Sequence, residues 1–418
     1  MLDLLLRGGT LVTHERVEQA AAIGIRDGVI ADSTGPARHV LDLNGRAVLP
    51  GFVNAHTHVA LSYARGRSED AGSAPAYTSG VPQGFALERS DALAFARLGV
   101  LEATLFGSTT LVDAYFHPHE AAQSALEVGV RMRVGQFIHD VDFAGIPHGR
   151  FDHDPALGER TLAAALAVIE RWEGAGDGRI TTTLSPHAPD TCSQRLLERI
   201  GDEHARTASD VTTHLAQSKG ELARVRERSG CTPTEALAAA GLLDDRLTAA
   251  HCVALEPPDI ERCGAARITV AHVPKGNATA AMLAPTPALR AAGAQIALAT
   301  DNMHGDMVEA MRWLIAVARI QLGRIDDEWQ PERALASATG SAELRPGDPA
   351  DLVVIDLRRP HLTPAGDPLG TLVHCAHGRD VEHVIVAGRL IVEDGRSTTV
   401  DEDAIRREAS ERAARLWD

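Results

Sequence analysis

The chain contains few aromatic residues, few basic residues and no long apolar segment. Only 4% of its 418 residues are aromatic, and 41 lysines and arginines stand against 57 aspartates and glutamates, a net charge of −16. This acidic balance argues against a basic surface for nucleic acid or for an anionic membrane. No apolar run approaches the ~20 residues of a transmembrane helix. We therefore expect neither nucleic acid nor a membrane as a partner.

Cysteine is also scarce, with five residues, an odd number without paired spacing. Such usage argues against a disulfide framework and favours a reducing compartment, so we expect a cytoplasmic protein. The first residues, MLDLLLRGGT, have neither the basic segment nor the cleavage site of a signal peptide. Histidine is the residue in excess, with 19 copies.

The two ends of the chain share one pattern. Residues 2–49 and 349–395 alternate short β-rich runs with Gly-Gly, Asp-Gly or Asn-Gly dipeptides, which is typical of β-hairpins. Neither segment is long enough to form a stable sheet domain alone. We expect residues 1–49 and 345–418 to pack together as a small, discontinuous β-sandwich domain.

Residues 50–344 instead alternate short β-branched runs with longer helical patterns, which indicates parallel strand–helix units. There are eight such runs: GFVNAH (51–56), STTLVDA (108–114), MRVGQFIH (132–139), ITTTLSPH (180–187), DVTTHLA (210–216), RLTAAHC (246–252), ITVAHVP (268–274) and AQIALATD (294–301). Eight units over about 300 residues predict an α/β fold with a (β/α)8 TIM barrel as catalytic domain. An open doubly wound sheet is the alternative, but no glycine fingerprint follows an early strand.

Each predicted strand has a polar residue at or near its C-terminal end. In six strands this residue is a histidine: His56 with His58, His139, His187, His214, His251 and His272. In the other two it is an aspartate, Asp113 or Asp301. In a barrel these ends converge on the face where active sites form. One such histidine alone is more often a hydrogen-bonded structural residue than a ligand. Six at the same end of a barrel indicate a functional site.

The most specific element of this pattern is the pair His56-x-His58. Alternate residues of a strand point to the same side, so both imidazoles can face one ion. Together with a strand-end histidine and a strand-end aspartate, the pair predicts a metal site. Three nitrogens and one carboxylate suit one zinc ion (Zn2+) per chain, with Fe2+ and other divalent metals as alternatives. Water bound to such an ion becomes hydroxide near pH ~7.

Seven motifs follow one another along nearly the whole chain: LPGFVNAHTHVAL, TLSPHAPDTCS, THLAQSKGE, AAHCVALEPPDI, VAHVPKGN, IALATDN and GDPADLVVIDL. With them the sequence resembles the amidohydrolase superfamily, in its mononuclear, metal-dependent aminohydrolase branch. Within this branch it is most similar to the methylthioadenosine/adenosylhomocysteine deaminases and the triazine hydrolases. The combination is specific for the superfamily and much less so for one substrate.

The resemblance implies roles for individual residues, beginning with four metal ligands: His56, His58, His214 and Asp301. It implies that His251 contacts the attacking water and polarises the leaving side of the substrate, and that Asp301 also accepts the proton of that water. His187 matches a position that faces the substrate, and His272 would be a structural residue or support a ligand. Because members of the family are often dimers or larger, a homo-oligomer is expected.

The sequence departs from this family at three places. The glutamate that the family carries three residues after the fifth-strand histidine is Gln217 here. The segment after the eighth strand is shorter than in the deaminases, and the loop after the first strand lacks the tryptophan-bearing helix of adenosine-type deaminases. These last two departures weaken the expectation of an adenosine substrate. We expect five residues to line the substrate pocket: Tyr63, Gln83, His187, Asn302 and His304.

Gln217 bears directly on mechanism, because an amide donates a hydrogen bond to a ring nitrogen but cannot deliver a proton. Two residues could take its place. Glu221 lies four residues further on, one helical turn of ~5.4 Å away; otherwise Asp301 would take the proton of the water and pass it to the leaving group. We predict a metal-dependent hydrolase that releases ammonia or an amine from a small-molecule N-heterocycle of purine, pyrimidine, pterin or triazine type, with His251, Asp301 and Gln217 as catalytic residues. The alternatives are hydrolysis of a cyclic amide or of a carbon–chlorine bond in the same fold, or a metal-binding protein with attenuated catalysis.

Overall fold

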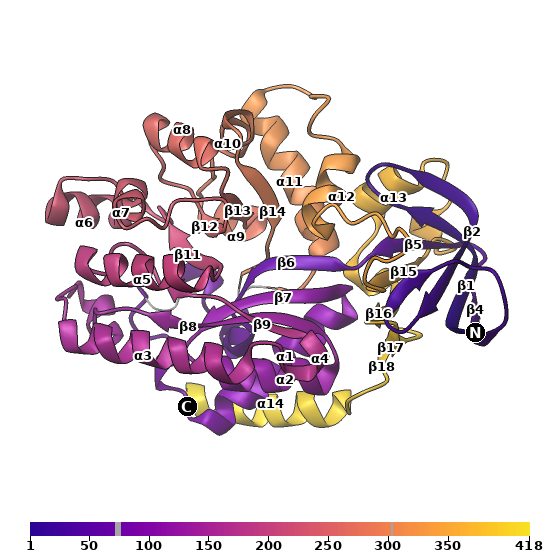
Figure 1. Cartoon of the computed structure of the whole chain (residues 1–418), viewed down its shortest axis with the longest axis horizontal. Coiled ribbons are helices and arrows are strands. Elements are labelled where there is room, and N and C mark those ends of the chain that lie inside the picture. The colour runs from indigo at the N-terminus through magenta and orange to yellow at the C-terminus, as the bar shows by residue number, and fades with distance from the viewer. Residues whose placement is uncertain (72–76, 302–303) are drawn as a thin grey trace.

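The computed structural model describes residues 1–71, 77–301 and 304–418. Parallel strands lie at the centre of the larger part of the molecule, beside a second sheet (Figure 1). The parallel strands are β6 (Phe52–Thr57), β7 (Ser108–Tyr115), β8 (Arg131–Ile138), β9 (Ile180–Thr182) with β10 (Ser185–Pro186), β11 (Val211–Leu215), β12 (Leu247–His251), β13 (Thr269–His272) and β14 (Gln295–Leu298). All eight predicted strand positions, and the α/β class, are confirmed.

These strands follow one another in the order of a barrel. Strands β6 to β10 form one parallel sheet and β11 to β14 another, and two isolated parallel bridges join them, Leu184 with Val211 and Thr57 with Asp301. The fourth strand is interrupted between β9 and β10 because Leu184 pairs with the second sheet, where its N–H donates to the carbonyl of Asp210 at 3.0 Å. The bridges bring the first and last strands together and so gather the strand ends on one face.

Helices connect and surround the parallel strands: α1 (Arg89–Leu105), α2 (Pro118–Val128), α3 (Pro155–Trp172), α4 (Ala175–Gly178), α5 (Gln194–Thr207), α6 (Lys219–Ser229), α7 (Pro233–Ala239), α8 (Pro257–Ala265), α9 (Pro274–Thr279), α10 (Thr286–Ala292), α11 (Met307–Leu322) and α12 (Pro331–Thr339). Local sequence sets their ends: the Ser193 side chain accepts the Leu196 N–H at the start of α5, and left-handed Gly230 ends α6. Short 3-10 helices lie in the loops: η1 (Val59–Ala64), η2 (Glu69–Ala71), η4 (Gly84–Ala86) and η5 (Phe143–His148).

Strands of the two terminal segments pair in one continuous hydrogen-bonded sheet. Its strands are β1 (Leu2–Val12), β2 (Val17–Arg26), β3 (Val29–Ala31), β4 (Ala37–Asp42), β5 (Arg46–Pro50), β15 (Leu352–Asp356), β16 (Val381–Val386), β17 (Arg389–Glu393) and β18 (Arg396–Ser397). The first half of β1 pairs with β4 and its second half with β5, with a register shift at Gly9. Gly8 adopts φ +78°, a left-handed conformation that glycine adopts readily. The strand can therefore change direction there, so that its first half pairs with β4 and its second half with β5. The sheet thus bends over one apolar core that includes Leu6, Ile25 and Leu352.

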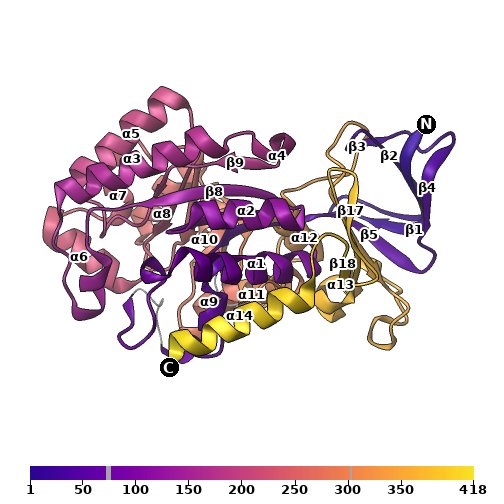
Figure 2. The ribbon, with the colours of Figure 1, turned by 90° about the horizontal axis from the view of Figure 1, so that it is seen from below.

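The C-terminal segment divides its contacts between the two parts of the molecule. Between the sheet strands it forms η6 (Pro360–Leu362), α13 (Pro368–Cys375) and η7 (Gly378–Asp380). Its last helix, α14 (Glu402–Trp417), leaves the sheet and runs along α1 on the barrel (Figure 2). There Arg412 pairs with Asp91 at 2.6 Å. The sheet pattern of residues 345–418 gave no indication of this barrel contact, because it is made by an amphipathic helix. Within the described ranges, no helix is long and apolar enough to cross a membrane.

Candidate metal centre and active site

Four histidines and one aspartate converge at the C-terminal ends of the parallel strands. His56 and His58 come from β6, His214 from β11 and His251 from β12, and Asp301 follows β14. One ring nitrogen from each of His56, His58 and His214 lies within 4.8 Å of the others, and the same holds for ligand atoms of His56, His251 and Asp301. The structure therefore brings together all four residues predicted to hold a metal, with His251 beside them.

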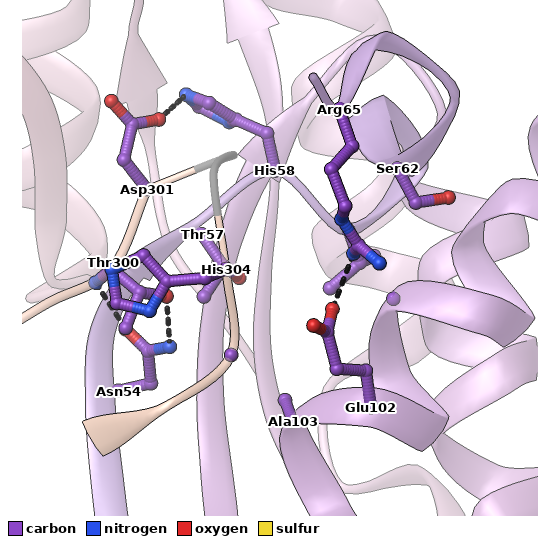
Figure 3. A pocket seen from close by; sticks show the side chains of 13 residues that line it. Asn54, Thr57, His58, Ser62, Arg65, Glu102, Ala103, Thr300, Asp301 and His304 are labelled. Carbon is purple, nitrogen blue, oxygen red and sulfur yellow. Dashed lines mark hydrogen bonds and ion pairs between the residues drawn. The ribbon is translucent and has the colours of Figure 1, made fainter. Parts of the chain in front are cut away.

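The two oxygens of the Asp301 carboxylate face different partners. Oδ1 lies 3.6 Å from Nε2 of His58 and 3.9 Å from Nε2 of His56, whereas Oδ2 lies 3.8 Å from Nε2 of His251. In Figure 3 the carboxylate of Asp301 points toward the His58 ring. One oxygen of Asp301 thus faces the two imidazoles of β6, and the other faces His251.

Hydrogen bonds at the outer nitrogens orient two of the rings. Nδ1 of His214 donates to the carbonyl of His187 at 2.8 Å, and Nδ1 of His251 donates to Oδ1 of Asn277 at 3.0 Å. Each bond fixes the tautomer and leaves Nε2 facing the centre, as the partners of metal-bound histidines do. Asn277 thereby orients His251, a role that the sequence had not suggested.

The environment keeps the predicted histidine ligands neutral. Burial is the main cause that lowers the pKa of His56, His58 and His214, and mutual repulsion between imidazolium charges adds to it at His56 and His214. Neutral imidazole is the form that binds metal. His56 is 1% exposed, and neither of its ring nitrogens has a hydrogen-bond partner within the described part of the chain. Such a buried, unpartnered donor set is costly unless something binds it, and a divalent cation fits it.

Backbone conformation at the strand ends is unusual. His251 has φ 72° and Asp301 has φ 59°, a left-handed conformation that side-chain-bearing residues rarely adopt and that costs about 1–3 kcal/mol. Both turns lie where a side chain is directed into the site. Strain of this kind is concentrated at functional positions.

Asp113, near the C-terminal end of β7, supports the turn after His58. Its Oδ2 accepts the backbone N–H of Val59 at 2.7 Å, and Thr57 donates to the same oxygen at 3.4 Å. Burial raises the pKa of the Asp113 carboxyl to about 7. The residue therefore holds the strand end that carries His56 and His58 and lies outside the group of ligand atoms.

Beside the imidazoles, His187 and Gln217 form a second group with Tyr77. The His187 ring lies 4.8 Å from that of His214 between centroids, and its Nδ1 is hydrogen-bonded to the Thr191 hydroxyl at 2.8 Å. Nε2 of Gln217 donates to Oη of Tyr77 at 3.1 Å. Both oxygens of Glu221 accept backbone N–H groups, those of residues 216 and 217, at 3.0 and 2.7 Å. Glu221 therefore holds the loop that carries Gln217, and its oxygens are occupied there.

His304 lines a pocket that opens beside Asp301 and His58 (Figure 3). Its Nδ1 accepts the backbone N–H of Asp306 at 3.2 Å, and burial lowers its pKa to about 4, so the ring is neutral. The far wall of the pocket carries the ion pair of Arg65 and Glu102. The predicted pocket residue Asn302 lies outside the described residues.

Tyr63 and Gln83 are held by the loops themselves. The hydroxyl of Tyr63 donates to the carbonyl of Pro82 at 2.7 Å, and its ring packs on Phe95. Nε2 of Gln83 donates to the carbonyl of Val81 at 3.0 Å. These contacts fix both residues within the loop after β6.

The remaining strand-end histidines have local partners. Nδ1 of His139 bonds the carbonyl of Val141 at 2.9 Å. His272 is 1% exposed, lies 3.4 Å from the Thr286 hydroxyl, and has its pKa lowered to about 3, chiefly by burial. Both have the contacts of structural residues. Sequence reasoning assigned no role to Tyr77 or Asn277, although Tyr77 is one of three tyrosines in the chain and Asn277 ends the motif VAHVPKGN.

Comparison with known proteins places this arrangement among related enzymes. The model of the amidohydrolase family matches residues 47–391. A 5-methylthioadenosine/S-adenosylhomocysteine deaminase from Pelotomaculum thermopropionicum is 32% identical, over 100% of this chain and 99% of its own. A 5'-deoxyadenosine deaminase from Methanosarcina barkeri is 29% identical over the same shares, 100% and 99%.

Solved structures share the fold along the whole chain. An adenosine deaminase from Xanthomonas campestris with bound zinc has a TM-score of 0.88 at 24% identity, covering 99% of this chain and 98% of its own. An atrazine chlorohydrolase from Arthrobacter aurescens in complex with zinc has a TM-score of 0.88 at 21% identity, covering 98% and 100%. One fold therefore carries both a deaminase and a chlorohydrolase among these neighbours.

Proposed function

Because the chain belongs to the amidohydrolase family and is a hydrolase of carbon–nitrogen bonds, we propose that it releases ammonia or an amine from an N-heterocycle of purine, pyrimidine, pterin or triazine type. The observation that carries this proposal is the split environment of Asp301. One carboxylate oxygen faces the imidazoles of β6 and the other faces His251. A carboxylate placed in this way can belong to a metal site and still hold a proton.

The residues that would hold the metal are His56, His58, His214 and Asp301, and we propose one divalent ion per chain, with zinc preferred. Three neutral imidazoles and a carboxylate are zinc ligands, and the two solved neighbours named above contain zinc. When bound, such an ion supplies a nucleophilic water at neutral pH. Removing any one of these side chains should therefore abolish hydrolysis.

Side chains of the protein would then transfer the proton of the attacking water to the leaving group. Oδ2 of Asp301 takes the proton from the attacking water and releases it to the departing nitrogen. His251, oriented by Asn277, holds its Nε2 at 3.8 Å from that oxygen. Because Gln217 cannot give up a proton, the same carboxylate serves both halves of the transfer. His187 and His304 border the site on the substrate side, and we retain Asn302, Tyr63 and Gln83 as proposed pocket residues.

A second function is favoured by Gln217 itself. Without a carboxyl at this position, a leaving group that needs no proton, such as chloride, is handled as readily as ammonia. Hydrolysis of a carbon–chlorine bond is therefore the alternative reaction. Opening of a cyclic amide is a further alternative, in which the departing ring nitrogen would receive its proton from Asp301. A metal-binding protein with attenuated catalysis is a weaker alternative, because all four predicted ligands and His251 are present and grouped.

The wider organisation is proposed along the same lines. Residues 50–344 would form the catalytic unit, with 1–49 and 345–418 as the accompanying β unit. All five cysteines are free thiols, which supports a cytoplasmic location. We propose a homo-oligomer acting on a small molecule.

The deciding experiment combines metal analysis with a substrate panel. Purified protein should contain about one divalent ion per chain, and zinc-loaded protein should release ammonia from at least one aminopurine, aminopyrimidine, aminopterin or aminotriazine. Chloride release from chlorotriazines, measured in parallel, distinguishes the alternative reaction. Protein that folds stably and binds no divalent metal would contradict the proposal.

A further inference from the structure

Tyr77 and Gln217 come from distant parts of the chain and share one hydrogen bond at the edge of the site. The bond joins Nε2 of Gln217 to Oη of Tyr77 over 3.1 Å. Gln217 lies three residues after His214, and the Tyr77 ring lies 6.5 Å from that of His187 at an interplanar angle of 28°. The pair thus borders the imidazole group at the position where Gln217 replaces the carboxyl that the resemblance implies.

Both partners are held from outside the site. The Tyr77 ring lies 6.4 Å from Phe151 at 26°, and the Arg224 guanidinium lies 4.2 Å from the Phe151 ring centroid. Arg224 in turn binds the buried carboxylate of Asp190 at 2.7 Å. The backbone N–H of Gln217 is fixed by Glu221 at 2.7 Å. Positions secured by stacking and by buried charge change little when a ligand enters.

The number of free hydrogen-bond donors determines what the Tyr77–Gln217 pair can bind. A carboxamide has two N–H donors and a phenol has one O–H donor. With Nε2 donating to Oη, the phenol hydrogen and the second amide hydrogen have no partner within the described part of the chain. With the amide turned, the phenol donates to the amide oxygen, and both N–H groups remain. In either arrangement two donor hydrogens are left and neither group carries charge.

We propose that Tyr77 and Gln217 act as one neutral, two-donor clamp that binds an acceptor atom of the substrate, a ring nitrogen or a carbonyl oxygen, without protonating it. The inference rests on the proposed function and narrows its substrates. They are rings with an acceptor atom next to the reacting carbon and a leaving group that receives its proton from Asp301. Burial raises the pKa of the Tyr77 phenol well above its ordinary value, so the phenol keeps its hydrogen at working pH.

The clamp is tested by ligand affinity, which does not require turnover. Purine carries ring-nitrogen acceptors, whereas indole has a similar shape and lacks them. Calorimetry on zinc-loaded protein should show that wild type prefers purine. Tyr77→Phe and Gln217→Ala should each reduce the purine-to-indole affinity ratio by about three- to tenfold. In the double variant this ratio should fall no further than in the more affected single variant, because the effects of two residues that act as a unit are not additive.

A charge variant supplies a second readout. Gln217→Glu places a carboxyl beside Tyr77, and its ionisation removes a donor, so purine affinity should fall relative to wild type as rising pH ionises this carboxyl. The matched control is Gln295→Glu, the same change at the exposed start of β14, which should follow the wild-type pH dependence. Zinc content and melting temperature are measured for every variant.

Three results would overturn the clamp: no purine binding by wild type, an unchanged affinity ratio in Tyr77→Phe, or single effects that multiply in the double variant. These results are separable from the proposed function. If the protein releases ammonia but the purine-to-indole affinity ratio is the same in the variants as in wild type, the clamp is contradicted and the proposed function stands. If the ratio changes in the variants but no member of the substrate panel is turned over, the clamp stands and the proposed function is contradicted.

Discussion

The two sides of the site are built by different parts of the fold. The proposed metal side (His56, His58, His214 and Asp301) stands on strand ends. The backbone amides of His214 and Asp301 donate to the carbonyls of His187 and His56, each at 3.0 Å. The proposed substrate side (Tyr77, His187, Gln217 and His304) stands largely on loops and is held by side-chain contacts such as Gln217 to Tyr77. Sheet register fixes the first group, whereas loop sequence fixes the second. A barrel can therefore keep one hydrolytic centre while its loops change the substrate.

The strongest test of this division is removal of one metal-side imidazole. His56→Ala should reduce bound metal from about one ion per chain to nearly none, and activity by about a thousandfold or more, because the ion supplies several kcal/mol to the reaction. Metal analysis after gel filtration checks the first expectation. His139→Gln is the control, because His139 also ends a strand but bonds Val141. Loss of metal in both variants would mean that the ligands extend beyond His56, His58, His214 and Asp301.

The same division explains what the sequence revealed. Strand-end residues such as His56 and Asp301 could be located because alternation and barrel topology bring all strand C-termini to one face. Tyr77 and Asn277 could not, because their roles depend on where loops return, and no periodicity encodes that. Tyr63 and Gln83 were expected in the pocket, and their polar groups bond loop carbonyls. The bend of β1 and the contact of α14 with the barrel were likewise invisible, since both arise from tertiary packing.

Asn277 lies between the two sides, since it orients His251 from a loop helix. Asn277→Ala should lower kcat/KM by about 10- to 100-fold with metal retained, as loss of an orienting partner does. Asn277→Asp should restore most of the activity, because only Oδ1 of Asn277 makes a bond and its Nδ2 has no partner among the described residues. Equal losses in the two variants would show that Asn277 acts through packing.

His272 is a strand-end histidine outside the metal side, and its burial should make the stability of the protein depend on pH. Its pKa in the folded protein is about 3 because of burial, against about 6.5 when unfolded. Between these values the unfolded chain binds the proton and the folded chain does not, so stability falls as pH decreases below about 6.5. Relative to His272→Gln, wild type should lose about 2 kcal/mol between pH 6.5 and pH 5.0. Urea unfolding of both zinc-loaded proteins measures this, and a pH-independent difference would place His272 in contact with solvent.

The smallest effect should come from the helix that supports the substrate side. Nε1 of Trp417 donates to the carbonyl of Tyr63 at 3.0 Å, and the Arg67 guanidinium lies 4.4 Å from its ring centroid. The bond joins α14 to η1, which directly follows His58 and contributes Ser62 to the pocket. Trp417→Phe keeps an aromatic ring and removes the donor.

One hydrogen bond is worth about 0.5–1.5 kcal/mol, so Trp417→Phe should raise KM about two- to tenfold with kcat and metal content unchanged. Trp172→Phe is the matched control: it also loses an indole hydrogen bond, to His119 at 2.8 Å, and has Arg171 at 5.3 Å from its ring centroid. Trp172 lies on α3, away from the loop after β6, so its KM should equal that of wild type. A fall in kcat or metal content in Trp417→Phe would show that α14 reaches the metal side, and the separation of strand-borne and loop-borne functions would then fail at η1.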